Sequence, residues 1–329
     1  MHDYLKGLRL FHGPILKTYL LLTAPLLFIL IEGVSRSDVV LLCLFSVDIL
    51  LYLWFGWAVN DYADRELDLA AGKKRTFGII RPRYAIAGIV LLFLSTLIVG
   101  AYLSKNSVYI LILCIGLTLG IVYSAPPFRL KGRGFWSLVF GPVYGKIIPI
   151  ILATLLFYRF EPWILVLLLS EGFKNGVDLF FHQIRDYQQD QAGGVKTFAV
   201  VTGLPSALHI LRLMTWVKII AAGFLGFTLA WFVPEYRFIL AAIVLCSIPA
   251  WFFMKRSHIR DLQNFSYLTF AYSWFGEMVF SLSPLWLSSI LVLRYPPFLP
   301  FLLIMILINL GLVRYYQNLI SQLNKTRLR

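Results

Sequence analysis

Long apolar segments alternate with short polar segments along almost the whole chain. A helix needs about 20 residues to cross the hydrocarbon core of a bilayer, and ten segments of roughly that length can be placed. They span approximately residues 15–33, 38–59, 84–104, 107–125, 135–157, 162–184, 206–232, 236–254, 268–292 and 297–317. This pattern predicts an all-α fold: a multi-span transmembrane bundle of nine to ten helices around a central cavity, formed as a single domain over residues 1–329.

The ninth segment differs from the others because polar residues lie near its middle. Glu277, Ser281 and Ser283 are followed by Pro284, and a proline removes a backbone hydrogen bond and distorts a helix. The sequence therefore predicts that this segment is broken, tilted or only partly inserted.

The first apolar segment has basic residues before it and at its start, namely Lys6, Arg9 and Lys17. A cleaved signal peptide would need a small-residue cleavage site after the apolar stretch, and no such site follows. We therefore expect this segment to remain as the first span.

The composition supports a membrane protein rather than a soluble one. Hydrophobic residues make up 59% of the chain and charged residues 14%, whereas soluble domains carry about 25% charged residues. The formal net charge of +14 would indicate nucleic-acid binding only if the basic residues formed a soluble face. Because they lie instead in short loops between apolar segments, we expect a lipid bilayer and no nucleic acid as partner.

Basic residues are divided unequally between alternate loops. The loops after the second, fourth, sixth and eighth segments hold groups of Lys and Arg. The intervening loops hold one basic residue each: Arg36, Lys105, Arg159, Arg237 and Arg294. Loops rich in Lys and Arg stay in the cytoplasm. The long loops 60–83 and 185–205 are therefore expected on the cytoplasmic side, where they would turn at Gly72 and at Gly193-Gly194 and form a small cap.

An acidic cluster follows the second apolar segment directly. The sequence Asn60-Asp-Tyr-Ala-Asp-Arg-Glu-Leu-Asp68 holds Asp61, Asp64 and Asp68 at i, i+3 and i+7, which would place them on one face of a helix. Like charges on one face repel each other unless a cation lies between them. Carboxylate oxygens suit Mg²⁺, which typically binds one or two protein carboxylates together with phosphate oxygens.

A second acidic cluster, Asp186 and Asp190, follows the sixth apolar segment. Asp61-Tyr62 is repeated as Asp186-Tyr187, Asp68-x3-Gly72 as Asp190-x3-Gly194, and Arg75-Thr-Phe as Lys196-Thr-Phe. A solvated helix end would explain one such cluster, but two with the same framing are better explained by two halves that face a shared site.

Polar residues recur every four positions in both segments that lead to the acidic clusters. The rows are Asp48, Tyr52, Gly56, Asn60, Asp64 and Asp68, and Lys174, Asp178, His182, Asp186 and Asp190. Ionisable residues inside a membrane usually face a cavity or a partner. Asp48 with Lys174, and Lys146 with Glu277, could equally be structural ion pairs. His182 could be a satisfied core histidine or could line a pocket.

A basic loop, Tyr123-Ser-Ala-Pro-Pro-Phe-Arg-Leu-Lys131, follows the fourth segment. Its prolines end the helix, and Arg129 and Lys131 then lie at the cytoplasmic rim. Anchoring of the loop in the cytoplasm would explain Arg133 by itself. Carboxylates, Mg²⁺ and basic side chains together form a site for a diphosphate, and in so apolar a protein its organic part would be a lipid chain.

These motifs resemble those of the UbiA-type intramembrane prenyltransferases. Asn60-Asp-x2-Asp64-x3-Asp68 is similar to the first motif of that family, Asp186-x3-Asp190 to the second, and the Tyr123–Lys131 loop to the family's loop between the fourth and fifth helices. The sequence departs from the family at Lys73-Lys74-Arg75-Thr76, where Arg-Pro is frequent, at His182-Gln183, and in its tenth apolar segment.

The resemblance implies Mg²⁺-dependent transfer of a prenyl group from a polyprenyl diphosphate to a hydrophobic acceptor, which would be an aromatic ring or another lipid-soluble nucleophile. It implies that Asn60, Asp61, Asp64 and Asp68 hold one Mg²⁺ and the diphosphate, and that Asp186 and Asp190 hold a second Mg²⁺ or orient the acceptor. Candidate substrate-binding residues are Arg65, Tyr123, Arg129, Lys131, His182 and Lys196. A terpene cyclase on the same scaffold and a cation or lipid transporter are the alternatives.

Overall fold

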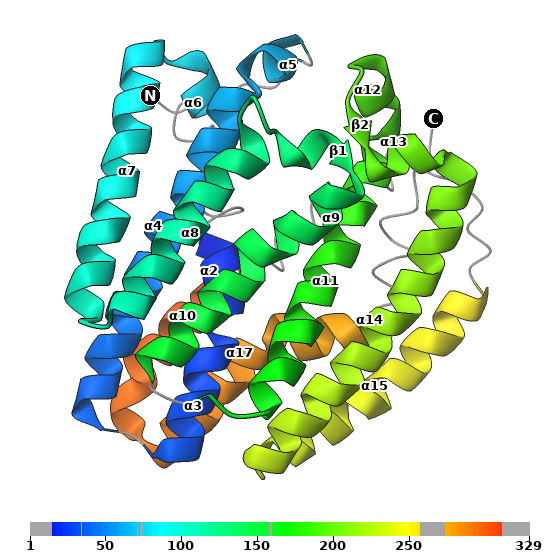
Figure 1. Cartoon of the computed structure of the whole chain (residues 1–329). Helices are drawn as coiled ribbons and strands as arrows, with labels where there is room; N and C mark the ends of the chain where they lie inside the picture. Colours follow the sequence, from blue (N-terminus) through cyan, green and yellow to red (C-terminus); the bar gives the residue numbers. More distant parts are fainter. Residues whose placement is uncertain are drawn as a thin grey trace.

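The structure is a computed structural model of the protein. It describes residues 15–33, 35–70, 72, 75–157, 160–256 and 274–310. Within these residues, eleven α-helices and the apolar helix Pro296–Leu310 form the body of the bundle (Figure 1). The eleven are α2 (Leu16–Leu21), α3 (Thr23–Glu32), α4 (Arg36–Ala63), α7 (Pro82–Leu103), α8 (Ser107–Ser124), α9 (Phe135–Pro142), α10 (Ile148–Leu156), α11 (Trp163–Arg185), α14 (Leu204–Phe232), α15 (Tyr236–Arg256) and α17 (Trp274–Arg294). Seven short elements lie at one end of the bundle (Figure 1): α5 (Arg65–Ala70), α6 (Thr76–Ile79), η2 (Leu130–Gly132), β1 (Arg133–Gly134), α12 (Tyr187–Ala192), β2 (Lys196–Thr197) and α13 (Phe198–Thr202).

The predicted apolar segments coincide with helices, which confirms the all-α membrane bundle. The first segment is divided into α2 and α3, and the fifth into α9 and α10 by one π-helical turn, η3 (Val143–Ile147). The tenth is an apolar helix over Pro296–Leu310, which begins as the 3₁₀ turn η5 (Pro296–Phe298). Six helices in the described part of the chain are long and apolar enough to cross a membrane.

The ninth segment is a helix with Pro284 inside it, so the expectation of a break there was wrong for residues 274–294. Serine hydroxyls satisfy carbonyl oxygens near the proline: Ser288 Oγ donates to Pro284 O at 2.6 Å, and Ser283 Oγ donates to Val279 O. Such side-chain bonds are one way in which membrane helices tolerate proline. The predicted residues 268–273 lie outside the described part of the chain.

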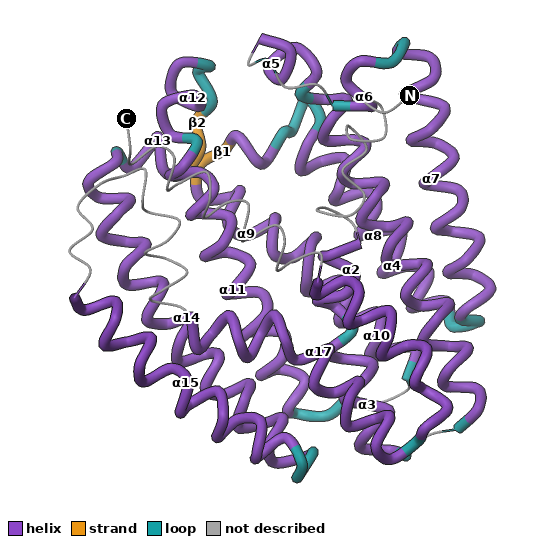
Figure 2. The backbone as a smooth tube through the Cα atoms, turned by 180° about the vertical axis from the view of Figure 1, so that it is seen from behind, coloured by secondary structure: helices purple, strands orange, loops and turns teal. Residues whose placement is uncertain are grey.

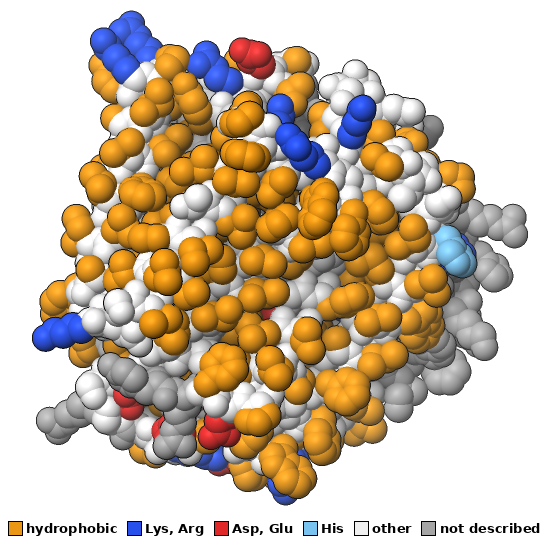
Figure 3. Space-filling view, viewed as in Figure 1, with side chains coloured by type: hydrophobic (Ala, Val, Ile, Leu, Met, Phe, Trp, Pro, Cys, Tyr) orange, Lys and Arg blue, Asp and Glu red, His pale blue; other side chains and the backbone are white. Residues whose placement is uncertain are grey.

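Apolar side chains cover the outer surface between the two ends of the bundle (Figure 3). Leu91 and Ile98 on α7 and Phe224 and Trp231 on α14 are each more than 60% exposed. A soluble monomer rarely exposes so large an apolar area. In the view of Figure 3, most Lys and Arg side chains lie at the end that carries the short elements.

Two pairs of long helices give the bundle its internal repeat: α4 packs along α7, and α11 packs along α14. Two short helices lie in the connection between the members of each pair. They are α5 (Arg65–Ala70) and α6 (Thr76–Ile79) in the first half, and α12 (Tyr187–Ala192) and α13 (Phe198–Thr202) in the second. Glycines Gly72 and Gly194 turn the chain with φ of 70° and 67°, as the sequence predicts.

A two-residue parallel pairing joins the two halves at this end (Figures 1 and 2). Strand β1 (Arg133–Gly134) follows the turn η2 (Leu130–Gly132), and it pairs with β2 (Lys196–Thr197) in the register Arg133 to Lys196. The basic loop after α8 is thereby fixed beside the loop that follows the second acidic cluster.

Both ion pairs proposed from the sequence were wrong. Asp48 accepts a hydrogen bond from Tyr109 Oη at 2.8 Å, while Lys174 pairs with Asp178 at 2.7 Å. Lys146 Nζ lies 2.8 Å from Glu171 Oε2, and Glu277 pairs with Lys218 at 2.5 Å. The sequence places each of these groups on a helix face but does not say which helix that face meets.

Candidate active site

The first acidic motif lies at a bend between two helices. Helix α4 ends at Ala63, Asp64 has φ −98° and ψ 6°, and α5 starts at Arg65. Backbone hydrogen bonding continues across the bend, from the Asp64 N–H to Asn60 O at 3.0 Å and from the Asp68 N–H to Asp64 O at 2.8 Å. The spacing predicted that Asp61, Asp64 and Asp68 share one face of a single helix. The bend at Asp64 shows that they do not lie along one regular helix.

The second motif repeats this bend. Helix α11 ends at Arg185, Asp186 has φ −90° and ψ 8°, and α12 starts at Tyr187. Asp186 is thus the structural counterpart of Asp64. The internal repeat seen in the sequence paired Asp61 with Asp186, because both precede a tyrosine. This pairing was wrong, since the residue at the helix bend in the first motif is Asp64.

Two basic side chains bind Asp64 from the loop after α8. Arg129 Nη2 donates to Asp64 Oδ1 at 2.7 Å, and Lys131 Nζ donates to Asp64 Oδ2. Arg129 has φ 41°, a left-handed conformation that residues other than glycine rarely adopt. The loop therefore holds an unfavourable backbone geometry while its side chains reach the acidic motif.

Lys131 also binds the other end of the same motif. Its Nζ donates to Asn60 Oδ1 at 2.7 Å, so that one ammonium group joins Asn60 and Asp64. Burial lowers the pKa of Lys131, and the adjacent Asp64 carboxylate opposes that change.

The observed contacts show that this donor set fits a metal ion. A cation, the Lys131 ammonium, already lies between the oxygens of Asn60 and Asp64. In the part of the chain that the structure describes, no three His, Cys, Asp or Glu side chains form a metal centre. A metal bound here would therefore need further oxygen ligands from a substrate phosphate or from water.

Gln183 connects the second motif to the basic loop. Its Nε2 donates to Ser137 Oγ at 2.8 Å, and Ser137 Oγ donates to Gly134 O at 2.7 Å. The backbone N–H of Ala199, at the start of α13, donates to Gln183 Oε1. This side chain therefore fixes β1 and α13 against α11, a positioning role that the sequence analysis did not assign.

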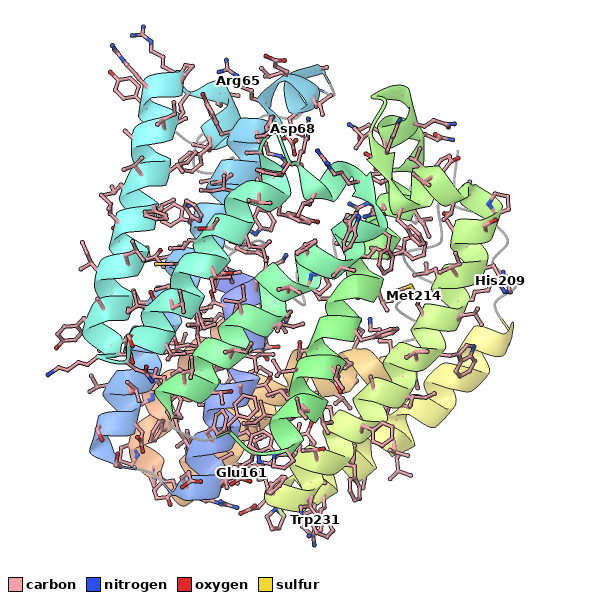
Figure 4. All side chains as sticks on the ribbon, in the orientation of Figure 1. Arg65, Asp68, Glu161, His209, Met214 and Trp231 are labelled. Atoms are coloured by element: carbon pink, nitrogen blue, oxygen red, sulfur yellow. The ribbon has the colours of Figure 1, made fainter. Side chains whose placement is uncertain are left out.

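The other predicted site residues lie at the same end of the bundle, where Figure 4 labels Arg65 and Asp68, opposite to Glu161 and Trp231. Arg75 Nε lies 3.7 Å from Asp68, and Arg185 Nε lies 3.2 Å from Asp186. The remaining ones are Asp61, which is buried, Asp190 on α12, Tyr123 near Asp64, His182 near Asp178, and Lys196, whose side chain is exposed.

Sequence comparison supplies the family. The profile of the UbiA prenyltransferase family matches residues 20–275. The chain belongs to this family. No curated protein matches it significantly.

Solved structures of this family share the fold of the chain. A UbiA homolog from Archaeoglobus fulgidus bound to DMAPP and Mg²⁺ is 18% identical, with a TM-score of 0.57 over 84% of this chain and 99% of that one. The same homolog bound to GPP and Mg²⁺ has a TM-score of 0.55 at the same identity and coverage. A digeranylgeranylglyceryl phosphate synthase is 13% identical, with a TM-score of 0.56 over 86% of this chain and 98% of that one.

The structure also reveals charged groups inside this UbiA-family bundle that the sequence analysis did not consider. Lys218, on α14, is 1% exposed and pairs with both Asp178 and Glu277. The sequence did contain a signal for Lys218: it is the one lysine within the apolar segment 206–232. A charge inside a membrane segment usually has a partner, so this lysine predicted a buried carboxylate nearby.

Proposed function

We propose that the chain is an intramembrane prenyltransferase that uses Mg²⁺ to transfer a prenyl group from a polyprenyl diphosphate to a hydrophobic acceptor, at the cytoplasmic end of the bundle. One observation carries this proposal: Asn60, Asp64, Arg129 and Lys131 converge within hydrogen-bond distance at one point. Oxygen ligands and flexible cations brought together in this way suit a metal ion and a diphosphate.

Each half of the repeat is assigned a part in this site. Asn60, Asp61, Asp64 and Asp68 would hold Mg²⁺ beside the diphosphate, and Asp186 and Asp190 would hold a second Mg²⁺ or orient the acceptor. When the diphosphate binds, Arg129 and Lys131 would release Asp64 and bind phosphate oxygens instead, because phosphate oxygens bind Arg and Lys strongly. The candidates for further substrate contacts are Arg65, Tyr123, His182 and Lys196.

The chemistry requires a neutralised leaving group. Bound Mg²⁺ would supply positive charge to the diphosphate. The carbon–oxygen bond of the allylic ester breaks, and its electron pair leaves with the diphosphate that Arg129 and Lys131 bind. The acceptor nucleophile then forms a bond to the prenyl carbon and loses a proton. The surrounding apolar helices would exclude water, which would otherwise capture the cation.

The ligands of the similar structures support this assignment. The Archaeoglobus fulgidus homolog was solved with DMAPP and Mg²⁺ and with GPP and Mg²⁺, and these are the classes of ligand proposed here.

Mg²⁺-dependent release of diphosphate from labelled geranyl and geranylgeranyl diphosphate tests the proposal. Asp64→Ala and Asp186→Ala are each expected to lower the release rate at least about 100-fold, the usual effect of removing a group that stabilises transition-state charge. Glu66→Ala is the matched control, because Glu66 is exposed and occupies one of the three unspecified positions between Asp64 and Asp68.

The products distinguish the alternatives. A product that contains acceptor and prenyl carbons supports transfer. A product that contains only prenyl carbons would identify a terpene cyclase. If neither diphosphate is cleaved with any acceptor, the enzyme assignment fails in favour of transport.

A further inference from the structure

Two tyrosines fill the space between α4, α8 and the turn η3. Tyr144 lies in η3, a π-helical turn, and Tyr52 lies on α4. Each hydroxyl donates to the backbone carbonyl oxygen of the other residue at 3.0 Å, and the ring centres are 4.9 Å apart. Turns of π-helix frequently lie at functional sites, and this one packs against the helix that carries the first acidic motif.

Three glycines make room for these rings. A Cβ atom at Gly56 on α4 would lie 1.8 Å from Tyr144 Oη, and one at Gly120 on α8 would lie 2.9 Å from Tyr144 Cε2. A Cβ atom at Gly116 would lie 2.8 Å from the Tyr52 ring. The tip of the Tyr144 ring is therefore held between two glycines of facing helices. Without this ring, the glycines would leave an open space between α4 and α8.

This space begins close to the proposed diphosphate site. Gly56 precedes Asn60 by one turn of α4, and both belong to the row of positions that leads to Asp64. Four residues of a helix span about 6 Å along its axis. A prenyl tail that extends along this row from a diphosphate at Asn60 and Asp64 would therefore meet the Tyr144 ring after about one helical turn.

The other side of the bundle interior carries charges. Lys17 on α2 lies 5.5 Å from the centre of the Trp57 ring. On α11, the Asp178 side chain is 35% exposed, and it is paired with the buried side chains of Lys174 and Lys218. A hydrocarbon tail packed against these groups would remove water from charges, which is costly. The favoured direction for the tail is therefore along α4 and α8.

The Tyr144 side chain is suited to stop a tail at this place. Tyr144 is partly exposed and so borders open space, whereas Tyr52 behind it is 0% exposed. Both hydroxyls already have a carbonyl partner, so that the surface left for a ligand is the apolar body of the ring. The two hydrogen bonds also fix the ring in its position between the helices.

We propose that Tyr144 forms the closed end of the prenyl pocket and so limits the length of the prenyl tail that the protein binds. This inference rests on the proposed prenyl transfer for the identity of the ligand as a prenyl diphosphate. Isoprene units beyond the Tyr144 ring gain no further burial between α4 and α8. Truncation of the side chain would open the space between Gly56 and Gly120 to them.

Binding of non-hydrolysable analogues tests this pocket without catalysis. The probes are geranyl and geranylgeranyl S-thiolodiphosphate, added with Mg²⁺ to the full-length protein in detergent. The measured quantity is the Kd of the geranyl probe divided by the Kd of the geranylgeranyl probe. Tyr144→Ala is expected to raise this ratio about tenfold, the gain from burying about two further methylene groups of the longer tail. Tyr144→Leu should raise it by a smaller factor, and it replaces Tyr144→Ala if that variant does not fold.

Two further variants assign the effect to the Tyr144 ring. Tyr144→Phe keeps the ring and should restore the wild-type ratio. Tyr236→Ala is the control for truncation of a buried tyrosine, because Tyr236 is 0% exposed and begins α15 at the end of the bundle opposite to the acidic motifs (Figure 1). Thermal unfolding without probe checks that each variant is folded.

An unchanged ratio in the folded Tyr144→Ala or Tyr144→Leu variant would overturn the proposal. An equal rise in Tyr236→Ala, or a wild type that binds neither probe, would overturn it as well. A raised ratio without any release of diphosphate from geranyl or geranylgeranyl diphosphate would retain the pocket and refute the prenyltransferase.

Discussion

At the scale of single residues, the side chains of the candidate site neutralise one another. Asp64 is bound by Arg129 and Lys131, and Lys131 also binds Asn60. A metal ion would therefore compete with Lys131 for the oxygens of Asn60 and Asp64. Because a diphosphate offers Lys131 another partner, binding of the metal and of the diphosphate should each strengthen the other.

Lys131→Gln is expected to change the two affinities in opposite directions. Removing the competing ammonium should tighten Mn²⁺ binding to the substrate-free protein several-fold. Loss of one charged contact should weaken diphosphate binding about tenfold. Electron paramagnetic resonance of Mn²⁺ and a prenyl diphosphate binding assay measure the two effects.

Arg133→Gln is the matched control, since Arg133 lies in the same loop, is exposed, and donates to Pro127 O at 2.9 Å. It removes the same charge and should leave both affinities nearly unchanged. Weaker Mn²⁺ binding by Lys131→Gln would contradict competition between the lysine and the metal.

At the scale of elements, the π-helical turn η3 locks the fifth span against α4. Tyr144, within η3, and Tyr52, on α4, donate hydrogen bonds to each other's backbone carbonyl oxygens at 3.0 Å, and their ring centres are 4.9 Å apart. The contact depends on Gly56, because a Cβ atom at that position would lie 1.8 Å from Tyr144 Oη.

Gly56→Ala is therefore expected to destabilise the protein by about 1–3 kcal/mol, the usual cost of overpacking a well-packed core. The Tyr144 ring would have to move and would break the two hydrogen bonds. Thermal or denaturant unfolding in detergent measures the change.

The control for this prediction is Gly223→Ala on α14, where an added Cβ meets no atom within 4 Å. Alanine favours a helix over glycine by roughly 0.5–1 kcal/mol, so the control should be neutral or stabilising. Equal effects of the two substitutions would show that the Tyr144 contact does not require Gly56.

At the scale of the whole molecule, buried ion pairs join helices that are distant in sequence. Lys218 on α14 binds Asp178 on α11 and Glu277 on α17 at 3.0 and 2.5 Å. Asp178 keeps a second partner, Lys174, but Glu277 would lose its ion pair if Lys218 were removed.

Lys218→Met is expected to destabilise the fold by about 3 kcal/mol, because removing one partner leaves a buried charge uncompensated. The double variant Lys218→Met/Glu277→Met keeps Lys174 with Asp178 and should recover a large part of that loss. Thermal unfolding of both variants, with Lys105→Met as an exposed control, measures the difference. No recovery in the double variant would mean that charge balance is not the cause.

The proposed orientation, with the acidic motifs on the cytoplasmic side, rests on the Lys and Arg residues of the loops. Glu66 lies at the end that carries the acidic motifs, and Lys105 lies in the loop between α7 and α8 at the other end (Figure 1). In a background in which Cys43, Cys114 and Cys246 are replaced, Glu66→Cys should react with an impermeant thiol reagent only from the cytoplasmic side. Lys105→Cys should react only from the opposite side, and the reverse pattern would refute the proposed orientation.

The sequence by itself determined the helices and the ends at which the chemistry is expected. Apolar segments of about 20 residues are required wherever a helix crosses a bilayer, and this is a property of each segment alone. The motifs around Asp64 and Asp186 and the turns at Gly72 and Gly194 are equally local. The membrane bundle, the cap and these turns were therefore confirmed, while the roles of the site residues stay predictions.

Only the tertiary structure decided which charged groups meet. Periodicity places Asp48 and Lys146 on helix faces, but the rotation and packing of neighbouring helices select Tyr109 and Glu171 as their partners. The bend at Asp64 likewise made it the counterpart of Asp186. A contact between distant segments depends on how all the helices pack.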